Sequence, residues 1–509
     1  MSENSTQNNS IKQSIKLLVT CIFMLIMQQT AWAQLSTNKK VVFDLSQSEN
    51  NEFNVIPYEK EGLLVLNSKA KSYGRENRLE FIMFNTNLDQ KWSNFYEPGL
   101  LFVLLKYFET PRYFYCLFRE LSSQKILVLR LDITTGDYVV NETSLLTNME
   151  VDMFKVLKNK ALIGGRYNDR PVVEMINLFA NTGKVLPDVH SNNLELNNIE
   201  VNPDDGTIYL LLKNTRNCKM SLKTYDYDGK LVDKEVLGEK GKLPLNGKLI
   251  KIPDGNYVMA GNYADNCSDY SVGFYTHALS NSVPTRFYDF TQLKNFLSYM
   301  PEKRQSRVKN RILKKNQKGK DFKLRQRLLL HPPIESHDGL TVLAEVFYPE
   351  YKSYNSNFYP LGRNYRWGAN NYYTFNNFRY THALILHFNR KGELLWDNSL
   401  SLKNLESRTL DYKVQLYEIQ HDKLVVAYPD EGVIKTNIVD GSDQTQEIIP
   451  LDLQSHDEKV VDTYQNELAA WYEQYFIAYG VQSVKQGNSS SPKEIFYLNK
   501  LTYKVDALN

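Results

Sequence analysis

The sequence of 509 residues contains little of several features that would point directly to a function. Its 61 basic and 58 acidic side chains nearly cancel to a net charge of +3, so overall charge gives no reason to expect nucleic acid as a partner. No segment after the N-terminal region is long and apolar enough to span a bilayer, so we expect a protein that is not membrane-spanning. Serine-elbow, phosphate-loop, HExxH and calcium-loop motifs are also missing, which leaves no enzyme class defined by a motif.

Residues 1–33 have the organisation of a secretory signal peptide. Two lysines precede an apolar run of 11 residues, Leu17–Met27, which is too short to cross a membrane as a helix. The small residues Ala31 and Ala33 suit a signal peptidase, so cleavage would leave Gln34 as the first residue. We therefore expect an exported protein, located in the periplasm in preference to the cell exterior.

The rest of the chain repeats with a period of 46 to 49 residues. The segment FNTNLDQKW at Phe84–Trp92 matches FNRKGELLW at Phe388–Trp396. The turn residues of successive units are 48, 47, 46 and, later in the chain, 49 positions apart: Leu88, Gly136, Gly183 and Gly229, then Gly392 and Gly441. The longer interval before Gly392 contains two insertions, residues 291–327 and 351–378, whose 65 residues account for the excess over two repeats.

Each period contains four short strands, most clearly between residues 151 and 189, and four antiparallel strands per unit are typical of a propeller blade. We predict an all-β, eight-bladed β-propeller over residues 34–509, with seven blades as the alternative. Val41–Leu45 has no partner before the first blade, and Lys493–Val505 has no fourth strand after it. Pairing of these two segments would close the ring and leave no open sheet edge.

Two turn segments, Asp132–Gly136 (DITTG) and Gly392–Trp396 (GELLW), resemble the quinoprotein-type repeats of the β-propeller superfamily. The resemblance covers most of the chain after residue 33, but the tryptophan is absent after Gly136, Gly183 and Gly229. It therefore implies the architecture, and no cofactor or quinone-binding residue. The Tyr- and Asn-rich composition, with LTVLAEVFYPEY at Leu340–Tyr351, is similar to uncharacterised exported proteins of the Bacteroidota, which implies a Gram-negative envelope without implying an activity.

The first insertion, residues 291–327, is expected to be helical and basic. Apolar residues recur at helical spacing from Leu293 to Met300, and Pro301 suits the first turn of a second helix. From Lys303 to Arg327 there are 12 basic residues and one acidic residue. The segment either docks on the otherwise acidic propeller or binds an anionic partner such as lipid phosphate, an acidic polysaccharide or an acidic protein. The candidate anion-binding residues are Lys303, Arg304, Arg307, Lys309, Arg311, Lys314 and Lys315.

The second insertion, residues 351–378, is rich in aromatic residues. Between Tyr351 and Tyr380, 11 of 30 residues are aromatic and seven more are Asn. Such a loop either packs on itself or presents rings and amides to a glycan or a protein. The candidate ligand-binding residues are Tyr354, Phe358, Tyr359, Tyr365, Trp367, Tyr372 and Tyr373. Connectivity predicts that both insertions open on one face, where binding residues usually gather.

Three cysteines follow the signal segment, so at least one thiol is unpaired. Cys116 lies in an apolar run and is expected to be buried. Cys218 and Cys267 are 49 residues apart, one period, in matching polar loops. They form a disulfide between neighbouring blades if the loops lie close enough, and otherwise remain two separate thiols.

The densest titratable cluster is HPPIESHD, with His331, Glu335, His337 and Asp338. Its prolines and the following Gly339 favour a hairpin turn over a metal site, and we expect no metal and no cofactor. The sequence as a whole favours an exported, non-catalytic protein that binds a glycan, an envelope component or a protein. The alternative is a propeller hydrolase or lyase that acts on polysaccharide. A channel lined by carboxylates and histidines would favour the enzyme.

Overall fold

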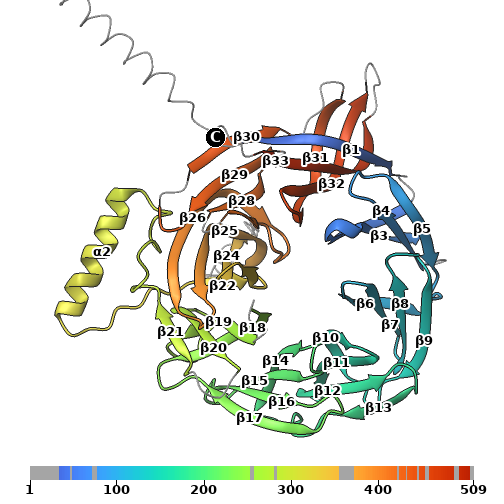
Figure 1. Ribbon diagram of the computed structural model, residues 1–509, viewed down its shortest axis with the longest axis horizontal. Helices are drawn as coiled ribbons and strands as arrows, with labels where there is room; N and C mark the ends of the chain where they lie inside the picture. Colours follow the sequence, from blue (N-terminus) through green and yellow to red (C-terminus); the bar gives the residue numbers. More distant parts are fainter. Residues whose placement is uncertain are drawn as a thin grey trace, which may run out of the picture.

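The computed structural model describes residues 34–45, 49–71, 77–252, 257–279, 284–354, 372–420, 423–430, 433–443, 446–452, 458–486 and 492–504. These residues form eight antiparallel sheets arranged as a wheel around a central channel (Figure 1). The predicted all-β, eight-bladed β-propeller is therefore confirmed, and the seven-bladed alternative is wrong. Residues 1–33, to which the signal peptide was assigned, lie outside the described residues.

The first four blades follow one another along the chain, and in each the strands run in sequence order from the channel to the rim (Figure 1). The first blade contains β2 (Glu49–Tyr58), β3 (Gly62–Lys71), β4 (Asn77–Phe84) and β5 (Gln90–Tyr96), with the short 3-10 turn η1 (Glu59–Glu61). The second contains β6 (Phe102–Glu109), β7 (Tyr113–Glu120), β8 (Lys125–Asp132) and β9 (Tyr138–Ser144). The third contains β10 (Glu150–Leu157), β11 (Lys160–Tyr167), β12 (Arg170–Asn177) and β13 (Thr182–Val185). The fourth contains β14 (Leu194–Val201), β15 (Ile208–Asn214), β16 (Met220–Tyr225) and β17 (Leu231–Leu237).

The last four blades carry the insertions and the closure. The fifth contains β18 (Leu243–Lys251), β19 (Tyr257–Ala264), β20 (Gly273–Ala278) and β21 (Arg286–Asp289). The sixth contains β22 (Arg327–Leu330), β24 (Gly339–Tyr354), β25 (Tyr372–Asn389) and β26 (Leu394–Ser407), and the short β23 (Ile334–Ser336) pairs with β24. The seventh contains β27 (Gln415–Gln420), β28 (Lys423–Asp430), β29 (Val433–Asp440) and β30 (Gln446–Asp452). The eighth contains β31 (Glu458–Tyr472), β32 (Tyr475–Gln486), β33 (Lys493–Lys504) and β1 (Gln34–Asp44).

The two ends of the described chain close the wheel, as predicted. β1 pairs antiparallel with β33, and Val41 lies opposite Leu498. The eighth and first blades are also locked together by a stack of Phe53 on Phe496, whose ring centroids are 3.9 Å apart. Across the same junction the Trp471 indole donates a hydrogen bond of 2.9 Å to the carbonyl of Gly62. The outer edge of the eighth blade is thus supplied by the N-terminal strand, which leaves no open edge in the ring.

The recurring turn residues have a physical reason. Gly136 and Gly392 adopt φ angles of 80° and 70°, in the left-handed region, and Leu88 adopts 57° at the same place in its blade. A side chain on Gly136 would collide with the ring of Trp92, which packs on this turn from the preceding blade. The turn is therefore part of the contact between these two blades.

The first insertion leaves β21 and forms a single helix, α2 (Glu302–Gln317), which stands at the rim of the wheel beside the fifth and sixth blades (Figure 1). The prediction of a first helix between Leu293 and Met300 was wrong, because this stretch consists of turns, whereas the second predicted helix, beginning at Pro301, is α2. The backbone amides of Lys294 and Asn295 donate to the carboxylate of Asp397 on β26, at 2.9 and 2.7 Å. These contacts fix the turns to the sixth blade.

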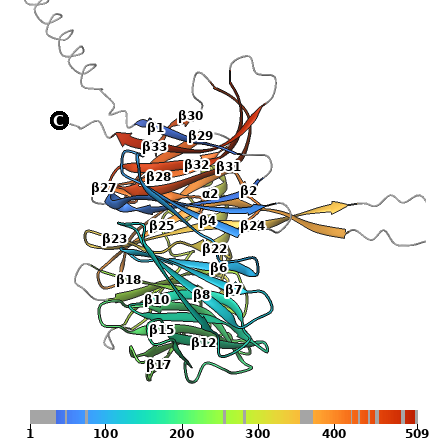
Figure 2. The same cartoon turned by 90° about the vertical axis from the view of Figure 1, so that its right-hand side faces the viewer.

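The second insertion lengthens the hairpin of β24 and β25, which projects from one face of the wheel (Figure 2). Register between the two strands continues to Tyr354 and Tyr372, and residues 355–371 lie outside the described part. The link between β26 and β27 and the beginnings of the inner strands β2 and β31 lie on this same face, since strand direction alternates within every blade. We call it the inserted face.

Candidate functional site

A cavity of about 1620 Å³ lies between the inner strands of the first, second, sixth, seventh and eighth blades, on the inserted face. Its wall is built from the beginnings of β2 and β31 and from residues 405–415, which link the sixth blade to the seventh. Pockets for small molecules usually measure about 300 to 1,000 Å³. This cavity therefore has room for a ligand of several linked units.

The wall of the cavity is polar and carries an excess of negative charge. It contains five acidic and two basic residues: Glu52, Glu406, Asp411, Asp430 and Glu467, with Arg408 and Lys413. Four tyrosines also line it: Tyr107, Tyr412, Tyr464 and Tyr479. The exposed fractions of Tyr107 and Tyr464 are 44% and 59%, so both offer ring surface to a ligand. Histidine is not among the described residues of this wall.

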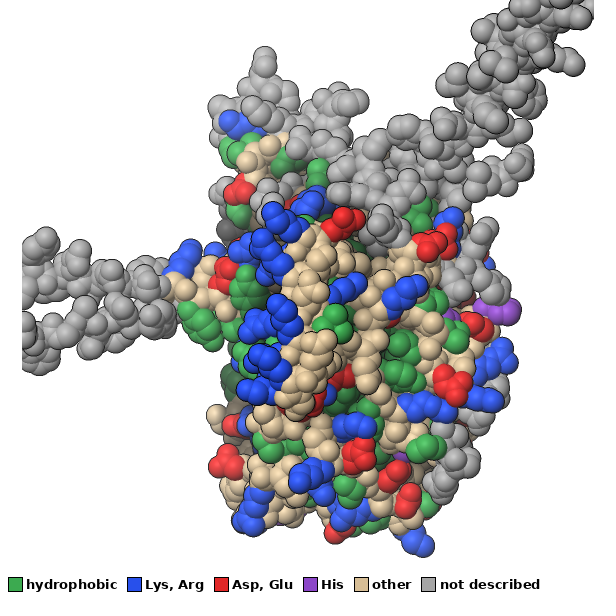
Figure 3. All heavy atoms as spheres, turned by 90° about the vertical axis from the view of Figure 1, so that its left-hand side faces the viewer, with side chains coloured by type: hydrophobic (Ala, Val, Ile, Leu, Met, Phe, Trp, Pro, Cys, Tyr) green, Lys and Arg blue, Asp and Glu red, His purple; other side chains and the backbone are tan. Residues whose placement is uncertain are grey.

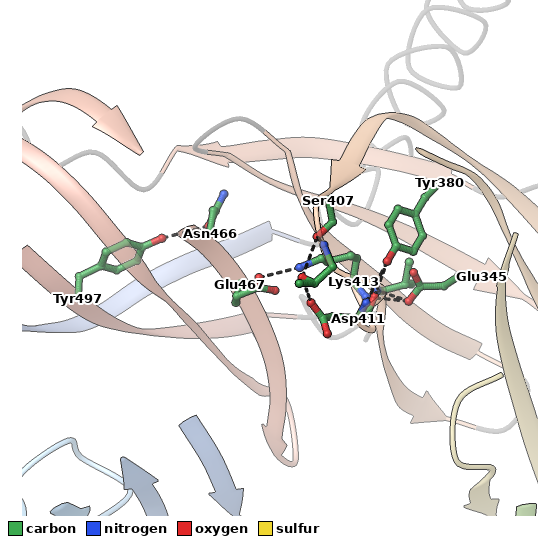
Figure 4. Close-up of polar contacts among 10 residues, drawn as sticks. Glu345, Tyr380, Ser407, Asp411, Lys413, Asn466, Glu467 and Tyr497 are labelled. Atoms are coloured by element: carbon green, nitrogen blue, oxygen red, sulfur yellow. Dashed lines mark hydrogen bonds and ion pairs between the residues drawn. The ribbon is translucent and has the colours of Figure 1, made fainter. Parts of the chain in front are cut away.

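The ion pair between Lys413 and Glu467 is the most buried charged contact of the wall. The ammonium lies 2.6 Å from the Glu467 carboxylate, and the two side chains are 6% and 19% exposed. Figure 4 shows Glu467, Lys413, Asp411 and Ser407 gathered where the seventh and eighth blades meet. Asp411 remains exposed to solvent, so one carboxylate here is paired and the other faces the cavity.

Glu345 of β24 fixes the link that contains Asp411 and Lys413 through hydrogen bonds to its backbone. This carboxylate is fully buried, and one of its oxygens accepts hydrogen bonds from the backbone amides of Lys413 and Val414, at 2.8 and 2.9 Å. The same oxygen lies 2.6 Å from Nε2 of His331. The Tyr380 hydroxyl donates a hydrogen bond of 2.7 Å to the carbonyl of Asp411 (Figure 4). These bonds fix the loop, so the charged side chains of the cavity are placed before a ligand arrives.

Charged residues recur at one register position of the inner strands. Each of these strands has a bulge at which pairing skips one residue, and the charged residue lies three positions after the skipped one: Lys155, Glu200, Lys248 and Glu467. Their signs alternate from the third blade to the fifth, and the Lys155 ammonium lies 3.9 Å from the Glu200 carboxylate. These four charges balance, in contrast to those of the cavity wall, to which Glu467 also belongs.

These channel residues were missed in the sequence, although a signal exists. Lys155, Glu200 and Lys248 are separated by 45 and 48 positions, close to the blade period of 46 to 49. Charged residues in first strands at that interval identify the lining of a propeller channel. Asp411 and Lys413 give no such signal, because they belong to an irregular link between two blades.

Burial changes the acidity of the channel carboxyls. It raises the pKa of Glu467, and the ammonium of Lys413 opposes this shift. The nearby carboxylates of Asp411 and Glu345 raise the pKa of Glu467 further. Burial also raises the pKa of Glu109, at the channel end of β6. These carboxyls therefore hold a proton at a higher pH than a carboxyl group in water.

The predicted anion-binding residues all lie on α2, where no side chain is buried. Within the described part of the chain, no carboxylate lies within 4 Å of Lys303, Arg304, Arg307, Lys309, Arg311, Lys314 or Lys315. The basic residues after the helix behave differently. Lys323 pairs with Asp289 at 2.7 Å and Arg325 with Asp265 at 2.6 Å. The ion pairs that tie the insertion to the propeller are thus made by the segment after α2, whereas the helix itself contacts the propeller through Val308.

Most of the predicted aromatic ligand-binding residues cannot be placed. Phe358, Tyr359, Tyr365 and Trp367 lie outside the described residues, and Tyr354, Tyr372 and Tyr373 are located in β24 and β25 by their backbone alone. At the described base of the hairpin, Phe375 contacts Tyr351 and Phe378, with ring centroids 6.1 and 4.8 Å apart. Their role in binding stays a prediction.

The cysteines follow the predicted pattern. A disulfide joins Cys218 to Cys267, with their Cα atoms 5.5 Å apart, and so connects the fourth and fifth blades on the inserted face. Cys116 is buried and free. The segment His331–Asp338 contributes the β23–β24 hairpin, and two of its side chains bond to buried neighbours: His331 to Glu345, and Asp338 to His387 at 2.9 Å. Among the described residues, no three His, Cys, Asp or Glu side chains are grouped as a metal site.

Within the same part of the chain, no helix has the length and apolar character needed to cross a membrane. No protein-family model matches the sequence. A search of curated proteins likewise returned no match.

Solved structures resemble the fold at low sequence identity. A polysaccharide lyase, Uly1, is 8% identical, with a TM-score of 0.38 over 78% of this chain and 89% of that chain. The β-propeller domain of the Trilobed protease from Pyrococcus furiosus is 8% identical, with a TM-score of 0.33 over 80% of this chain and 99% of that one. An uncharacterised protein, lmo1340 from Listeria monocytogenes, is 8% identical, with a TM-score of 0.35 over 74% and 88%. These similarities concern the propeller architecture and say nothing about what this chain binds.

Proposed function

We propose that this protein is an exported, non-catalytic binding protein that takes a neutral or amine-bearing glycan into the cavity on the inserted face. The observation that supports this most directly is the cavity itself, with its volume of about 1620 Å³ and its lining of tyrosines, amides and carboxylates. A smaller, apolar pocket would instead suit a compact hydrophobic ligand.

The tyrosines supply the stacking surface that a sugar ring requires. Tyr107 projects from the second blade and Tyr464 from the eighth, so the two rings approach the cavity from different blades. Carboxylates and amides beside them accept and donate hydrogen bonds to hydroxyl groups. Because acidic residues outnumber basic ones in the wall, a glycan with uronic acid or sulfate groups would be repelled.

A second candidate function, acid–base chemistry on the bound glycan, is supported by Glu467. Its pKa is raised by burial, and the exposed carboxylate of Asp411 lies close enough to raise it further. Two carboxyl groups of different acidity are the usual equipment for cleaving a glycosidic bond. However, the Glu467 carboxylate is already engaged in an ion pair with Lys413, which stabilises its charged form. For this reason we favour binding over catalysis.

The proposal is tested by a glycan array that contains neutral, amine-bearing and acidic oligosaccharides. We expect binding to the first two classes, and a loss of more than about tenfold in affinity on Tyr107→Ala or Tyr464→Ala, because stacking on an aromatic ring is removed. Phe179→Ala is the matched control, since Phe179 is 72% exposed and lies outside the cavity. Binding restricted to acidic glycans, or equal affinity in all three variants, would contradict the proposal.

The same oligosaccharides decide between binding and catalysis. A binding protein releases the ligand intact after long incubation. Shortened products that disappear in Glu467→Gln would establish the enzyme instead.

A further inference from the structure

We propose that α2 is a docking strip that holds the protein against a membrane surface rich in anionic lipid. The strip consists of five residues of α2, Lys303, Arg304, Arg307, Arg311 and Lys314, and of Lys318, which caps its C-terminal end. This inference does not depend on the glycan proposal, because α2 stands at the rim of the wheel and contributes no residue to the cavity.

The basic residues of the strip form a single row along the helix. One side of α2 faces the propeller, and Gln305, Val308, Ile312 and Lys315 are its partly buried residues. With about 100° between successive residues, the six strip residues fall within a sector of about 100° that adjoins this side. The row extends for about 22 Å at a rise of about 1.5 Å per residue. Figure 3 shows Lys and Arg side chains gathered along the helix.

The charges of the strip are available to an external partner. Among the described residues, no carboxylate lies within 4 Å of any of the six, although acidic residues of the propeller pair with Lys323 and Arg325 directly after the helix. The only ring contact described for the strip is that of Arg311, whose guanidinium lies 5.5 Å from the centroid of Phe322. Six unneutralised cations in one row repel each other, and an anionic surface relieves that repulsion.

The strip is anchored to both the fifth and the sixth blade. Before the helix, Tyr299 stacks on His382 with ring centroids 3.6 Å apart, and Phe296 stacks on Phe290 at 4.6 Å. After the helix, Lys323 is tied to Asp289. Both ends of the insertion are therefore fixed, and the helix presents its charges without a large loss of conformational entropy on binding.

The shape of the strip favours a flat partner over a chain. A polysaccharide or a single nucleic acid strand is usually held in a groove with aromatic rings on which its units stack. The strip has no aromatic residue of its own and lies on the convex surface of one helix. The β24–β25 hairpin also projects on the side of the molecule along which the basic side chains gather (Figure 3). Tyr351 and Phe375 at its base are 58% and 45% exposed, and such rings suit the headgroup region of a bilayer.

The experiment is flotation of the purified protein with phosphatidylcholine vesicles, with and without phosphatidylglycerol. We expect binding only when phosphatidylglycerol is present, and release when salt rises from about 50 mM to about 500 mM, because the Debye length shortens. Five substitutions in the strip, Lys303→Gln, Arg304→Gln, Arg307→Gln, Arg311→Gln and Lys314→Gln, should lower vesicle affinity by more than about 100-fold.

A control variant removes five exposed basic residues elsewhere: Arg216→Gln, Lys219→Gln, Lys230→Gln, Lys234→Gln and Lys240→Gln. It changes net charge equally, so it should lose less than about fivefold in affinity if position matters. Circular dichroism of both variants checks that the fold is kept. Equal losses in the two variants, absence of vesicle binding, or tighter binding to a soluble sulfated polysaccharide or to DNA would overturn the proposal.

Discussion

The cavity and α2 are two polar regions of one molecule with opposite charge and opposite construction. The cavity is concave, is assembled from five blades, and carries five acidic against two basic residues. The helix is convex, is a single continuous segment, and carries a row of basic residues that form no ion pair with any carboxylate in the described part of the chain. Because an anionic partner is attracted to one region and repelled by the other, the two regions select different partners. A propeller of near-neutral net charge can thus hold two sites that overall charge conceals.

The two regions also differ in how they are held. The cavity link is fixed by the buried carboxylate of Glu345, which accepts hydrogen bonds from two backbone amides at 2.8 and 2.9 Å. The helix is fixed at its ends by ring stacking and an ion pair, and its strip residues stay exposed to solvent. Changes that disturb one support should therefore leave the other region intact.

The largest effect is expected from removing the disulfide, which lies apart from both regions. Cys218→Ser combined with Cys267→Ser opens a loop of 49 residues and should lower the free energy of unfolding by about 4 kcal/mol. Urea unfolding followed by tryptophan fluorescence measures the change, and wild-type protein in reductant should behave in the same way. Glycan and vesicle binding should both persist at 25 °C. Loss of only one of them would show that the disulfide supports that region after all.

Acid should weaken the support of α2 before that of the cavity. The pKa of His382 is lowered to about 3 by burial, whereas the unfolded state titrates near 6.5. Between these values the unfolded state binds the proton and the folded state does not, so stability falls as pH decreases, by about 2 kcal/mol at pH 5. His382→Phe keeps a ring against Tyr299 and should remove this part of the pH dependence. Hydrogen exchange at pH 5 should show protection lost first in residues 294–300, and uniform loss around the wheel would contradict the expectation.

Neutralising carboxylates of the cavity should weaken binding of amine-bearing oligosaccharides and leave binding of neutral ones unchanged. Glu52→Gln combined with Asp411→Asn removes two exposed negative charges of the wall. Affinity for an amine-bearing oligosaccharide should fall about tenfold, while its neutral, acetylated counterpart binds as before. Glu195→Gln with Asp233→Asn is the control, because both residues are exposed and lie outside the cavity. Calorimetric titration gives both affinities, and an equal loss for the two ligands would argue against charge selection.

The smallest effect distinguishes two charges on the same helix. Arg307 belongs to the strip, whereas Lys309 lies two residues later, about 160° away around the helix axis. Arg307→Gln should reduce affinity for anionic vesicles about fivefold, and Lys309→Gln less than about twofold, although both remove one charge. Identical losses would mean that net charge, and not the row, governs binding.

The architecture could be predicted from the sequence because each blade repeats a similar pattern of strands and turns. A left-handed turn residue, as at Gly136 and Gly392, and an apolar four-strand pattern recur in unit after unit, and the unpaired Val41–Leu45 and Lys493–Val505 predicted the closure. Local spacing alone misled at Leu293–Met300, which forms turns bonded to Asp397 of the sixth blade through the amides of Lys294 and Asn295.

The cavity could not be predicted from the sequence, because its wall is not encoded by one segment. Its wall collects residues from five blades, so no short motif contains it. Asp411 and Lys413 owe their positions to Glu345, which is 66 and 68 residues away in sequence and carries no distinguishing pattern. The basic helix, by contrast, is one segment and was visible as a run of charge. The structure was needed only to show that its basic residues lie in a single row and form no ion pair with the described carboxylates.

The most direct test of two independent sites of opposite charge is a calorimetric titration of the protein with an oligomer of glucosamine, before and after saturation with phosphatidylglycerol-containing vesicles. The account predicts the same dissociation constant in both titrations and in the variant with five substitutions in α2. No binding of the oligomer, or competition between the oligomer and the vesicles, would contradict it.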